Sequence, residues 1–189
     1  MRRVALSFLF VLLSACVGNN QRIPNAAQST DAVQKPAELA ERNPSSEFPI
    51  PVLIGRVNDY ADILTSKERA ELDATLAAYE RETTHQIALL TVQTLNAETI
   101  EGFSFRVANA WKLGRKNLDN GVLVVVAPND RRARIELGAG MSRFVSDSAA
   151  QQIMDNSMVP QFRVGQFGRG IELGIQRLME VCRAYKVQP

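Results

Sequence analysis

Histidine is almost absent from this sequence of 189 residues, and its scarcity removes several classes of chemistry. His85 is the only histidine, so a zinc site with two histidines and the HExxH motif of zinc proteases are both excluded. No Walker A motif occurs, which excludes P-loop nucleotide hydrolysis. Gly138-Ala139-Gly140 is not a dinucleotide fingerprint, because arginine stands at position 143 where the motif has its third glycine.

Cysteine is nearly as scarce, with only Cys16 and Cys182 in the chain. Leu178, Met179 and Val181 surround Cys182 in the sequence, which predicts a buried thiol rather than a reactive one. A cysteine nucleophile paired with His85 is therefore disfavoured. Long apolar runs are also missing after the N-terminus, and no later segment is long and apolar enough to cross a membrane.

The first fifteen residues have the plan of a secretory signal peptide. Arg2 and Arg3 are followed by an apolar stretch over 4–13 and by the small residues Ser14 and Ala15. Leu13-Ser14-Ala15-Cys16 resembles the bacterial lipobox, which implies that Cys16 is lipidated and becomes the N-terminus of the mature protein. The alternative is a plain signal peptide with an incidental cysteine.

The lipobox resemblance implies a place in the cell envelope, with the lipid as the membrane anchor. Val17 follows the cysteine, and by resemblance to Gram-negative sorting rules this favours the periplasmic face of the outer membrane. Loss of Arg2 and Arg3 with the leader reduces 22 basic side chains to 20, which equals the number of acidic ones. A neutral mature protein gives no reason to expect nucleic-acid binding.

A linker separates the leader from a globular domain. Residues 16–51 form the lipidated N-terminus and a flexible linker, because they hold five of the eight prolines and show no apolar period. The composition becomes globular at Val52, and residues 52–189 are long enough to form one domain with its own core.

Helix and strand patterns alternate along this domain. Thr65 and Glu68 match a capping box, and Asn96 is the expected N-cap of a second helix. In chain order, the sequence predicts a helix over 66–82, a strand over 87–92, a helix over 97–113, strands over 122–127 and 134–137, a helix from 146 or 147 to about 158, and a helix over 166–186. This order predicts an α/β fold, a three-layer α/β/α sandwich with a small mixed sheet.

Three stretches resemble the TPM domain family of bacterial envelopes and plant thylakoids. They are VNDYADILTSKE from residue 57, LGRKNLDNGVLVVVAPNDRRARIELGAG from residue 113, and VSDSAAQQIMDNSMVPQFRVGQFGRGIELGI from residue 145. The resemblance implies an α/β/α sandwich over residues 56 to about 185. It departs from the family at Gly138-Ala139-Gly140, where family members usually carry Gly-Tyr-Gly.

Carboxylates are the remaining candidates for chemistry. Asp59, Asp119, Glu136 and Asp147 lie at the ends or on the faces of the predicted elements, and hard oxygen donors of this kind suit Ca²⁺ or Mg²⁺ if the loops converge. Each residue also has a structural alternative: an Asx-turn for Asp59, turn chemistry for Asp119, solvent exposure for Glu136 and a helix N-terminal charge for Asp147. Arg131, Arg132 and Arg134 cluster at a turn, where a phosphate, a lipid headgroup or solvent could face them.

Two functions follow from the resemblance. The family has been linked to divalent-cation binding and membrane-complex maintenance, and some members to acid phosphatase activity. We expect an envelope module that binds or assists membrane proteins, with a metal-assisted acid phosphatase acting on phosphoesters as the alternative.

Overall fold

The computed structural model describes residues 48–183. Cys16, the leader and nearly all of the predicted linker lie outside these residues, so the expected lipid anchor remains a prediction. The described chain forms a four-stranded sheet in the order β1-β2-β3-β4. Its strands are β1 (Val57–Asp59), β2 (Gln86–Thr91), β3 (Gly121–Ala127) and β4 (Arg132–Leu137).

The sheet is mixed, as the sequence predicts. Strands β1, β2 and β3 run parallel, with Val57 opposite Leu89 and Gln86 opposite Gly121. Strand β4 turns back and pairs antiparallel with β3, with Val124 opposite Ile135. Sequence reasoning missed β1, because its three residues offer no alternation. Inside the fold, the buried Asn58 amide of β1 donates to the carbonyls of Gly55 and Leu89.

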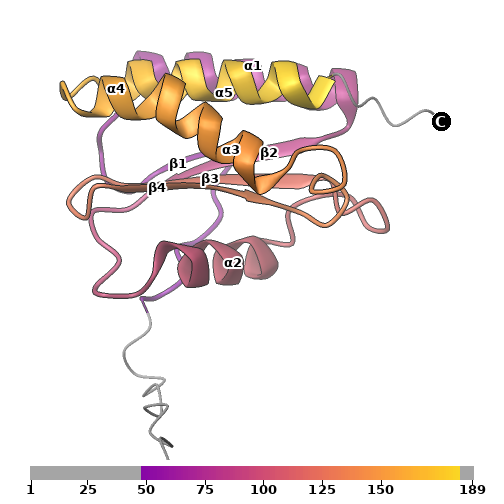
Figure 1. Ribbon diagram of the computed structural model, residues 1–189, viewed down its shortest axis with the longest axis horizontal. Coiled ribbons are helices and arrows are strands. Elements are labelled where there is room, and N and C mark those ends of the chain that lie inside the picture. Colours follow the sequence, from indigo (N-terminus) through magenta and orange to yellow (C-terminus); the bar gives the residue numbers. More distant parts are fainter. Residues whose placement is uncertain (1–47, 184–189) are drawn as a thin grey trace, which may run out of the picture. The chain divides into compact units, whose positions relative to one another are not determined.

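Helices cover both faces of the sheet, which confirms the three-layer sandwich (Figure 1). Helices α1 (Ser66–Thr83), α3 (Asp147–Ile153) and α5 (Phe167–Arg183) lie on one face, and α2 (Ile100–Trp111) lies on the other. Each face of the sheet has its own hydrophobic core, and successive residues of β3 alternate between the two. Val122, Val124 and Val126 pack in the core under α1 and α5, and Leu123, Val125 and Ala127 pack in the core under α2. A strand buried on both faces explains why its sequence is apolar throughout.

The helix caps agree with the sequence at one helix and differ at another. Thr65 and Glu68 form the predicted capping box at the start of α1. Helix α2 begins later than predicted, with Thr99 as its N-cap. Asn96 instead has φ 48°, a left-handed conformation that asparagine tolerates and that an N-cap does not use.

The third helix extends past its predicted end. The sequence predicts a stop near Met158, before Pro160, but a π-helical turn (Met154–Met158) leads directly into α4 (Val159–Phe162). Proline is tolerated in the first turn of a helix, where its missing N–H would have no partner. The wide turn therefore lets the chain continue through Pro160 as a bent helix rather than end there.

Packed structure begins before Val52. The ring of Phe48 meets Phe103 of α2 edge-on at 5.6 Å between centroids. Arg106 Nη2 donates to the Phe48 carbonyl at 2.8 Å, and Trp111 Nε1 donates to the Pro51 carbonyl at 2.9 Å. The last residues assigned to the linker thus lie against α2. Among the described helices, none combines the length and apolarity that a bilayer span requires.

These contacts predict the effect of trimming the N-terminus. A chain that begins at Val52 should unfold with a free energy about 2 kcal/mol lower than one that begins at residue 45. It loses an aromatic pair and three hydrogen bonds, the third from the Phe48 N–H to Glu98. The melting temperature should fall by roughly 5–10 °C, as scanning calorimetry can measure. Equal melting temperatures would place residues 48–51 in the linker, as the sequence predicts.

Candidate functional site

The four predicted metal ligands do not form one site. Asp59 ends β1 at the carboxyl edge of the parallel strands, where its register partner Thr91 lies opposite Val126. Asp119 precedes β3 at the opposite edge, seven positions before Val126. At about 3.3 Å per residue, this places the two aspartates roughly 20 Å apart along the sheet.

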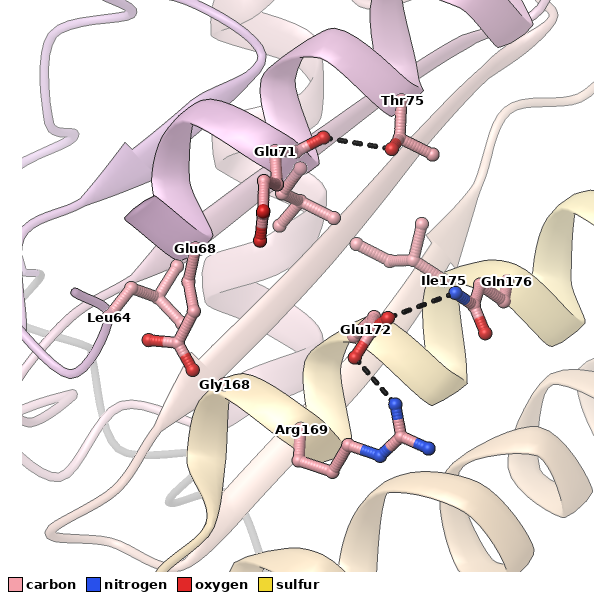
Figure 2. Close-up of a pocket in the computed structure, with 10 residues that line it drawn as sticks. Leu64, Glu68, Glu71, Thr75, Gly168, Arg169, Glu172, Ile175 and Gln176 are labelled. Atoms are coloured by element: carbon pink, nitrogen blue, oxygen red, sulfur yellow. Dashed lines mark hydrogen bonds and ion pairs between the residues drawn. The ribbon is translucent and has the colours of Figure 1, made fainter. Parts of the chain in front are cut away.

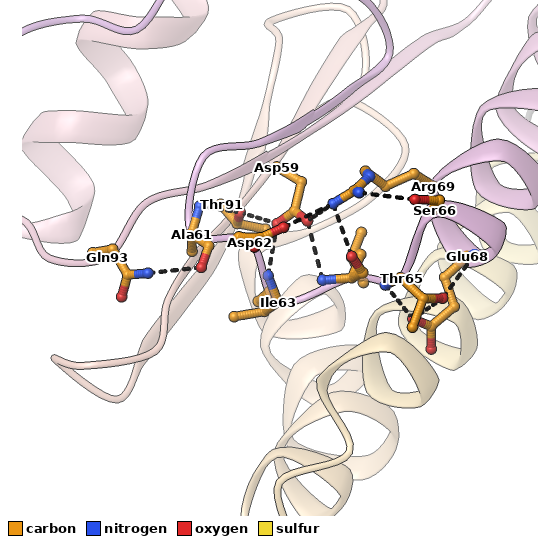
Figure 3. A network of polar contacts seen from close by, with 11 residues as sticks. Asp59, Ala61, Asp62, Ile63, Thr65, Ser66, Glu68, Arg69, Thr91 and Gln93 are labelled. Carbon is orange, nitrogen blue, oxygen red and sulfur yellow. Dashed lines mark hydrogen bonds and ion pairs between the residues drawn. The ribbon is translucent and has the colours of Figure 1, made fainter.

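Asp59 holds the loop between β1 and α1 together (Figure 3). Its carboxylate accepts hydrogen bonds from Thr91 Oγ1 at 2.5 Å and from the backbone N–H groups of Ile63 at 3.2 Å and Leu64 at 3.0 Å. Arg69 Nη1 lies 2.9 Å from its second oxygen, and the Asp59 side chain is 1% exposed. A buried carboxylate with this many donors has a structural role that already accounts for its charge.

Arg69 joins the same network to the start of α1. Its Nη1 also contacts Asp62 at 3.1 Å and donates to the Leu64 carbonyl at 2.8 Å. Hydrogen bonds from Arg69 to Asp59 and Asp62 raise the pKa of the guanidinium, although Asp62 is 86% exposed. The network fixes the path from the sheet edge into α1, and sequence reasoning did not foresee this partner of Asp59.

Glu136 also has protein partners. It lies on the α2 side of β4, where Arg134 Nε approaches it at 2.7 Å and Ser104 Oγ donates to it at 2.9 Å. The side chain is only 15% exposed, so it does not simply face solvent. Arg134, one of the clustered turn arginines, is therefore committed to this pair.

Asp119 and Asp147 lie at the same end of the sheet, as the hairpin between β3 and β4 predicts. The chain leaves β4 beside the entry of β3: Gly138 N donates to Gly121 O at 2.9 Å, and Gly140 N donates to Asp119 O at 3.0 Å. Both aspartates are exposed. Within residues 48–183, neither carboxylate makes a hydrogen bond or ion pair, and no three acidic, cysteine or histidine side chains gather as a metal cluster.

The glycine pair and the neighbouring asparagine explain how this end is built. A Cβ on Gly138 would lie 2.3 Å from Asp119 O, and one on Gly140 would lie 1.8 Å from Leu118 O, so both positions require glycine for backbone contact. Asn120 is buried, accepts from Arg115 N at 2.8 Å and donates to Thr84 O at 2.9 Å. The Asp-Asn-Gly motif is thus a packed junction between two loops and two strands.

His85 and Cys182 are both buried beside Tyr79. The Tyr79 hydroxyl lies 2.9 Å from His85 Nδ1, and burial lowers the pKa of the histidine. Burial also raises the pKa of the Cys182 thiol to about 11, which keeps it protonated at neutral pH. The predicted burial of Cys182 is confirmed, and neither residue is placed to act on a substrate.

An acidic groove separates α1 from α5 (Figure 2). It encloses about 160 Å³, and Leu64, Leu72 and Ile175 contribute its apolar lining. Its acidic side chains are engaged locally, since Glu68 caps the α1 N-terminus and Glu172 pairs with Arg169 at 2.8 Å. The glutamates Glu68 and Glu172 on the two sides of this groove therefore already have partners.

A larger groove of about 740 Å³ lies where the β3–β4 turn faces α4 and the start of α5. Half-buried Phe162 and Phe167 stand in its wall with ring centroids 5.3 Å apart, beside Val126, Ala133 and Val159. Exposed Arg131 and Arg163 also line it, together with Arg132. Sequence reasoning found the turn arginines but missed Arg163, because 31 positions separate it from Arg132.

These features place the chain in a family. The TPM domain family matches residues 57–181, and the chain belongs to that family. The match covers the sheet and its flanking helices, and the sequence resemblance is therefore confirmed. No curated protein matches the chain.

Solved structures share the fold. The N-terminal domain of a protein from P. gingivalis is 25% identical, with a TM-score of 0.62 over 68% of this chain and 82% of that one. The BA42 protein from Bizionia argentinensis is also 25% identical, with a TM-score of 0.58 over 65% of this chain and 83% of that one. The N-terminal domain of the cg2496 protein from Corynebacterium glutamicum, at 13% identity, has a TM-score of 0.55 over 76% and 88% of the two chains, and this similarity extends to the fold alone.

Proposed function

We propose that this TPM domain is a membrane-tethered envelope module that binds or assists membrane proteins. The groove between the β3–β4 turn and α4 supports the proposal, because aromatic, aliphatic and arginine side chains line it and no histidine, cysteine, serine or carboxylate does. Aromatic residues and arginine are the types enriched where proteins bind one another. A lining of this kind is suited to binding rather than to acid–base or nucleophilic chemistry.

Divalent-cation binding remains part of the proposal, now confined to one end of the sheet. Asp119 and Asp147 fit best, since their exposed carboxylates have no partner among the described residues, whereas Asp59 and Glu136 already neutralise arginines. Ca²⁺ takes six to eight oxygen ligands and accepts water among them, so two carboxylates could form part of such a site. Mg²⁺ retains more of its water and is the second candidate.

Calcium should stabilise the protein through these two residues. Millimolar Ca²⁺ is expected to raise the melting temperature by several degrees, since a ligand at a hundredfold excess over Kd stabilises the native state by about 2.7 kcal/mol. Asp119→Asn combined with Asp147→Asn should abolish the rise, while Asp73→Asn on α1 should retain it. Calorimetry with the wild-type protein and its variants tests this. The cation role is wrong if Ca²⁺ and Mg²⁺ leave the wild-type melting temperature unchanged.

The tether makes a separate prediction. Cys16→Ser should move the protein from the membrane fraction to the soluble envelope fraction, or leave an uncleaved precursor, because the lipid would no longer be attached. Membrane fractionation with immunoblotting measures the outcome, and labelling with a radioactive fatty acid checks acylation. Cys182→Ser is the matched control and should fractionate like the wild type. Cleaved Cys16→Ser protein that stays with membranes would contradict the lipid anchor.

Photo-crosslinking tests the module itself. A photoreactive amino acid at Val164, which is 68% exposed beside the groove, should yield crosslinks to membrane proteins in intact cells. The same probe at Phe105, exposed on α2, is the control position and should yield fewer crosslinks. Equal, unspecific labelling from both positions would contradict binding through the groove.

A phosphatase assay tests the alternative. Hydrolysis of p-nitrophenyl phosphate at acid pH is measured with Ca²⁺, Mg²⁺ or Mn²⁺ and with a chelator. Turnover that the chelator removes, and that Asp119→Asn with Asp147→Asn also removes, would establish the metal-assisted phosphatase and overturn the non-catalytic module. A divalent cation in such a reaction would stabilise the negative charge of the transferred phosphoryl group.

A further inference from the structure

We infer that the groove between the β3–β4 turn and α4 receives an acidic peptide segment of a partner protein, one that alternates carboxylates with aromatic or aliphatic side chains. The inference rests on the proposed binding function and names the chemistry of its partner. It depends on the two different walls of the groove and on the charges that they carry.

The first observation is that two arginines of the groove have no acidic partner among the described residues. Arg131 lies on the turn after β3, and Arg163 lies at the end of α4. Among residues 48–183, neither guanidinium has a carboxylate within ion-pair distance, whereas Arg56, Arg69 and Arg134 all do. Guanidinium groups bind carboxylates through paired, charge-assisted hydrogen bonds. Two such groups on separate walls of one groove are therefore complementary to an acidic ligand.

The second observation is the apolar lining between these charges. The rings of Phe162 and Phe167, with Val159 and Ala133, offer contact to hydrophobic side chains. A volume of about 740 Å³ lies within the range of about 300–1,000 Å³ typical of ligand pockets and accommodates a few side chains. In an extended peptide, successive side chains point to opposite sides. One set can face the rings while the other reaches the arginines at the rim.

A peptide fits this shape better than a membrane surface does. A bilayer is nearly flat and meets protruding basic or apolar residues, whereas the apolar groups here line a hollow. Gly165, with φ 76°, turns the chain between α4 and α5, so Arg163 and the exposed Val164 stand along the margin of the groove. Recognition of acidic motifs by arginine clusters is an established mode of peptide binding.

Fluorescence anisotropy with a defined probe tests the inference. The full-length protein in non-ionic detergent is titrated into a fluorescein-labelled hexapeptide that alternates glutamate and phenylalanine. We expect saturable binding that 0.5 M NaCl weakens, because salt screens exposed charges. The same peptide with lysine in place of glutamate should not bind. Absence of saturable binding to the glutamate peptide, or equal binding of both peptides, would overturn the inference.

Matched variants locate the site. Arg131→Glu with Arg163→Glu should weaken binding of the glutamate peptide at least tenfold. Arg131→Gln with Arg163→Gln should also weaken this binding, and it replaces the first variant if charge reversal impairs folding. Arg143→Glu, an exposed residue at the opposite end of the sheet, should bind like the wild type. Unchanged affinity in the folded glutamine double variant would overturn the inference.

The same variants separate this inference from the proposed function and from a lipid site. Phosphatidylglycerol vesicles test for a lipid site. If they bind the wild type but not the glutamine double variant, and compete with the peptide probe, the groove binds lipid and the peptide ligand is overturned. If crosslinks from Val164 to membrane proteins persist in the double variant and the peptide does not bind, the acidic peptide ligand is overturned. The proposed module function would still stand. Loss of those crosslinks in the double variant supports both.

Discussion

Asp59→Ala is expected to lower the free energy of unfolding by about 3 kcal/mol. The substitution removes a carboxylate with a 1% exposed side chain and leaves the N–H groups of Ile63 and Leu64 without their acceptor. It also leaves Arg69 without its buried partner, and breaking a buried ion pair from one side typically costs 3–5 kcal/mol. The lower end applies because the Arg69 side chain is 35% exposed and gains water in exchange.

Asp62→Ala is the matched control. Asp62 contacts the same guanidinium at 3.1 Å but is 86% exposed, so its loss should cost less than about 1 kcal/mol. Urea unfolding of both variants measures the difference. Equal stabilities would mean that the Asp59 network contributes little. A metal role for Asp59 predicts instead that Asp59→Asn abolishes the stabilisation by Ca²⁺, an effect that we expect only from Asp119 and Asp147.

Gly140→Ala should destabilise the protein by a similar amount, about 3 kcal/mol. An added Cβ would lie 1.8 Å from the carbonyl oxygen of Leu118 and 3.1 Å from the Asp119 carbonyl carbon. Backbone atoms cannot turn aside as a flexible side chain can, so the loop after β4 must move away from the entry of β3. Overpacking usually costs 1–3 kcal/mol and occasionally more.

Gly55→Ala provides the control, because a Cβ there meets no atom within 4 Å. It should leave stability unchanged or raise it by about 0.5 kcal/mol, since alanine restricts the unfolded chain. Chemical denaturation compares the two variants. If the free energy of unfolding of Gly140→Ala lies within about 1 kcal/mol of the wild-type value, the loop adjusts freely to the added Cβ.

The same glycine variant links packing to the candidate cation site. Displacement of the loop after β4 should separate Asp147 from Asp119, so Ca²⁺ should no longer raise the melting temperature of Gly140→Ala. Gly55→Ala should keep the full rise. If Ca²⁺ raises the melting temperatures of both variants equally, Ca²⁺ binding does not depend on the junction between these two loops.

Local sequence patterns predicted much of the fold. The capping box at Thr65 and Glu68 starts α1 as predicted, since a cap depends on residues three positions apart. The apolar run over 122–127 lies within the buried β3, because both of its faces are covered. The family resemblance rested on the same motifs and was confirmed over residues 57–181. The hairpin also brought Asp119 and Asp147 to one end, since a tight turn fixes where its strands return.

Three predictions of detail were wrong, because contacts in the fold or the geometry of a preceding turn outweighed the local sequence pattern. Val57–Asp59 became a strand only through pairing with β2. Phe48 joined the fold because α2 offers Phe103 and Arg106, which lie more than fifty positions away. Pro160 failed to end its helix because a π-helical turn preceded it. The β2 partners of Val57–Asp59 and the α2 partners of Phe48 lie far along the chain, so neither can be identified from a short window of sequence.

The sequence by itself determined most of the helices and strands, the burial of β3 on both faces and the family, because these depend on residue type and short spacing. Tertiary structure alone decided the roles of the charged residues. It placed Asp59 against Arg69 and Glu136 against Arg134, and gave Asp119 and Asp147 no side-chain partner among residues 48–183. It also brought Arg163 to the groove of Arg131. The physical reason is that a charge acts over a few ångströms in space, and only the folded chain fixes which groups lie within that distance.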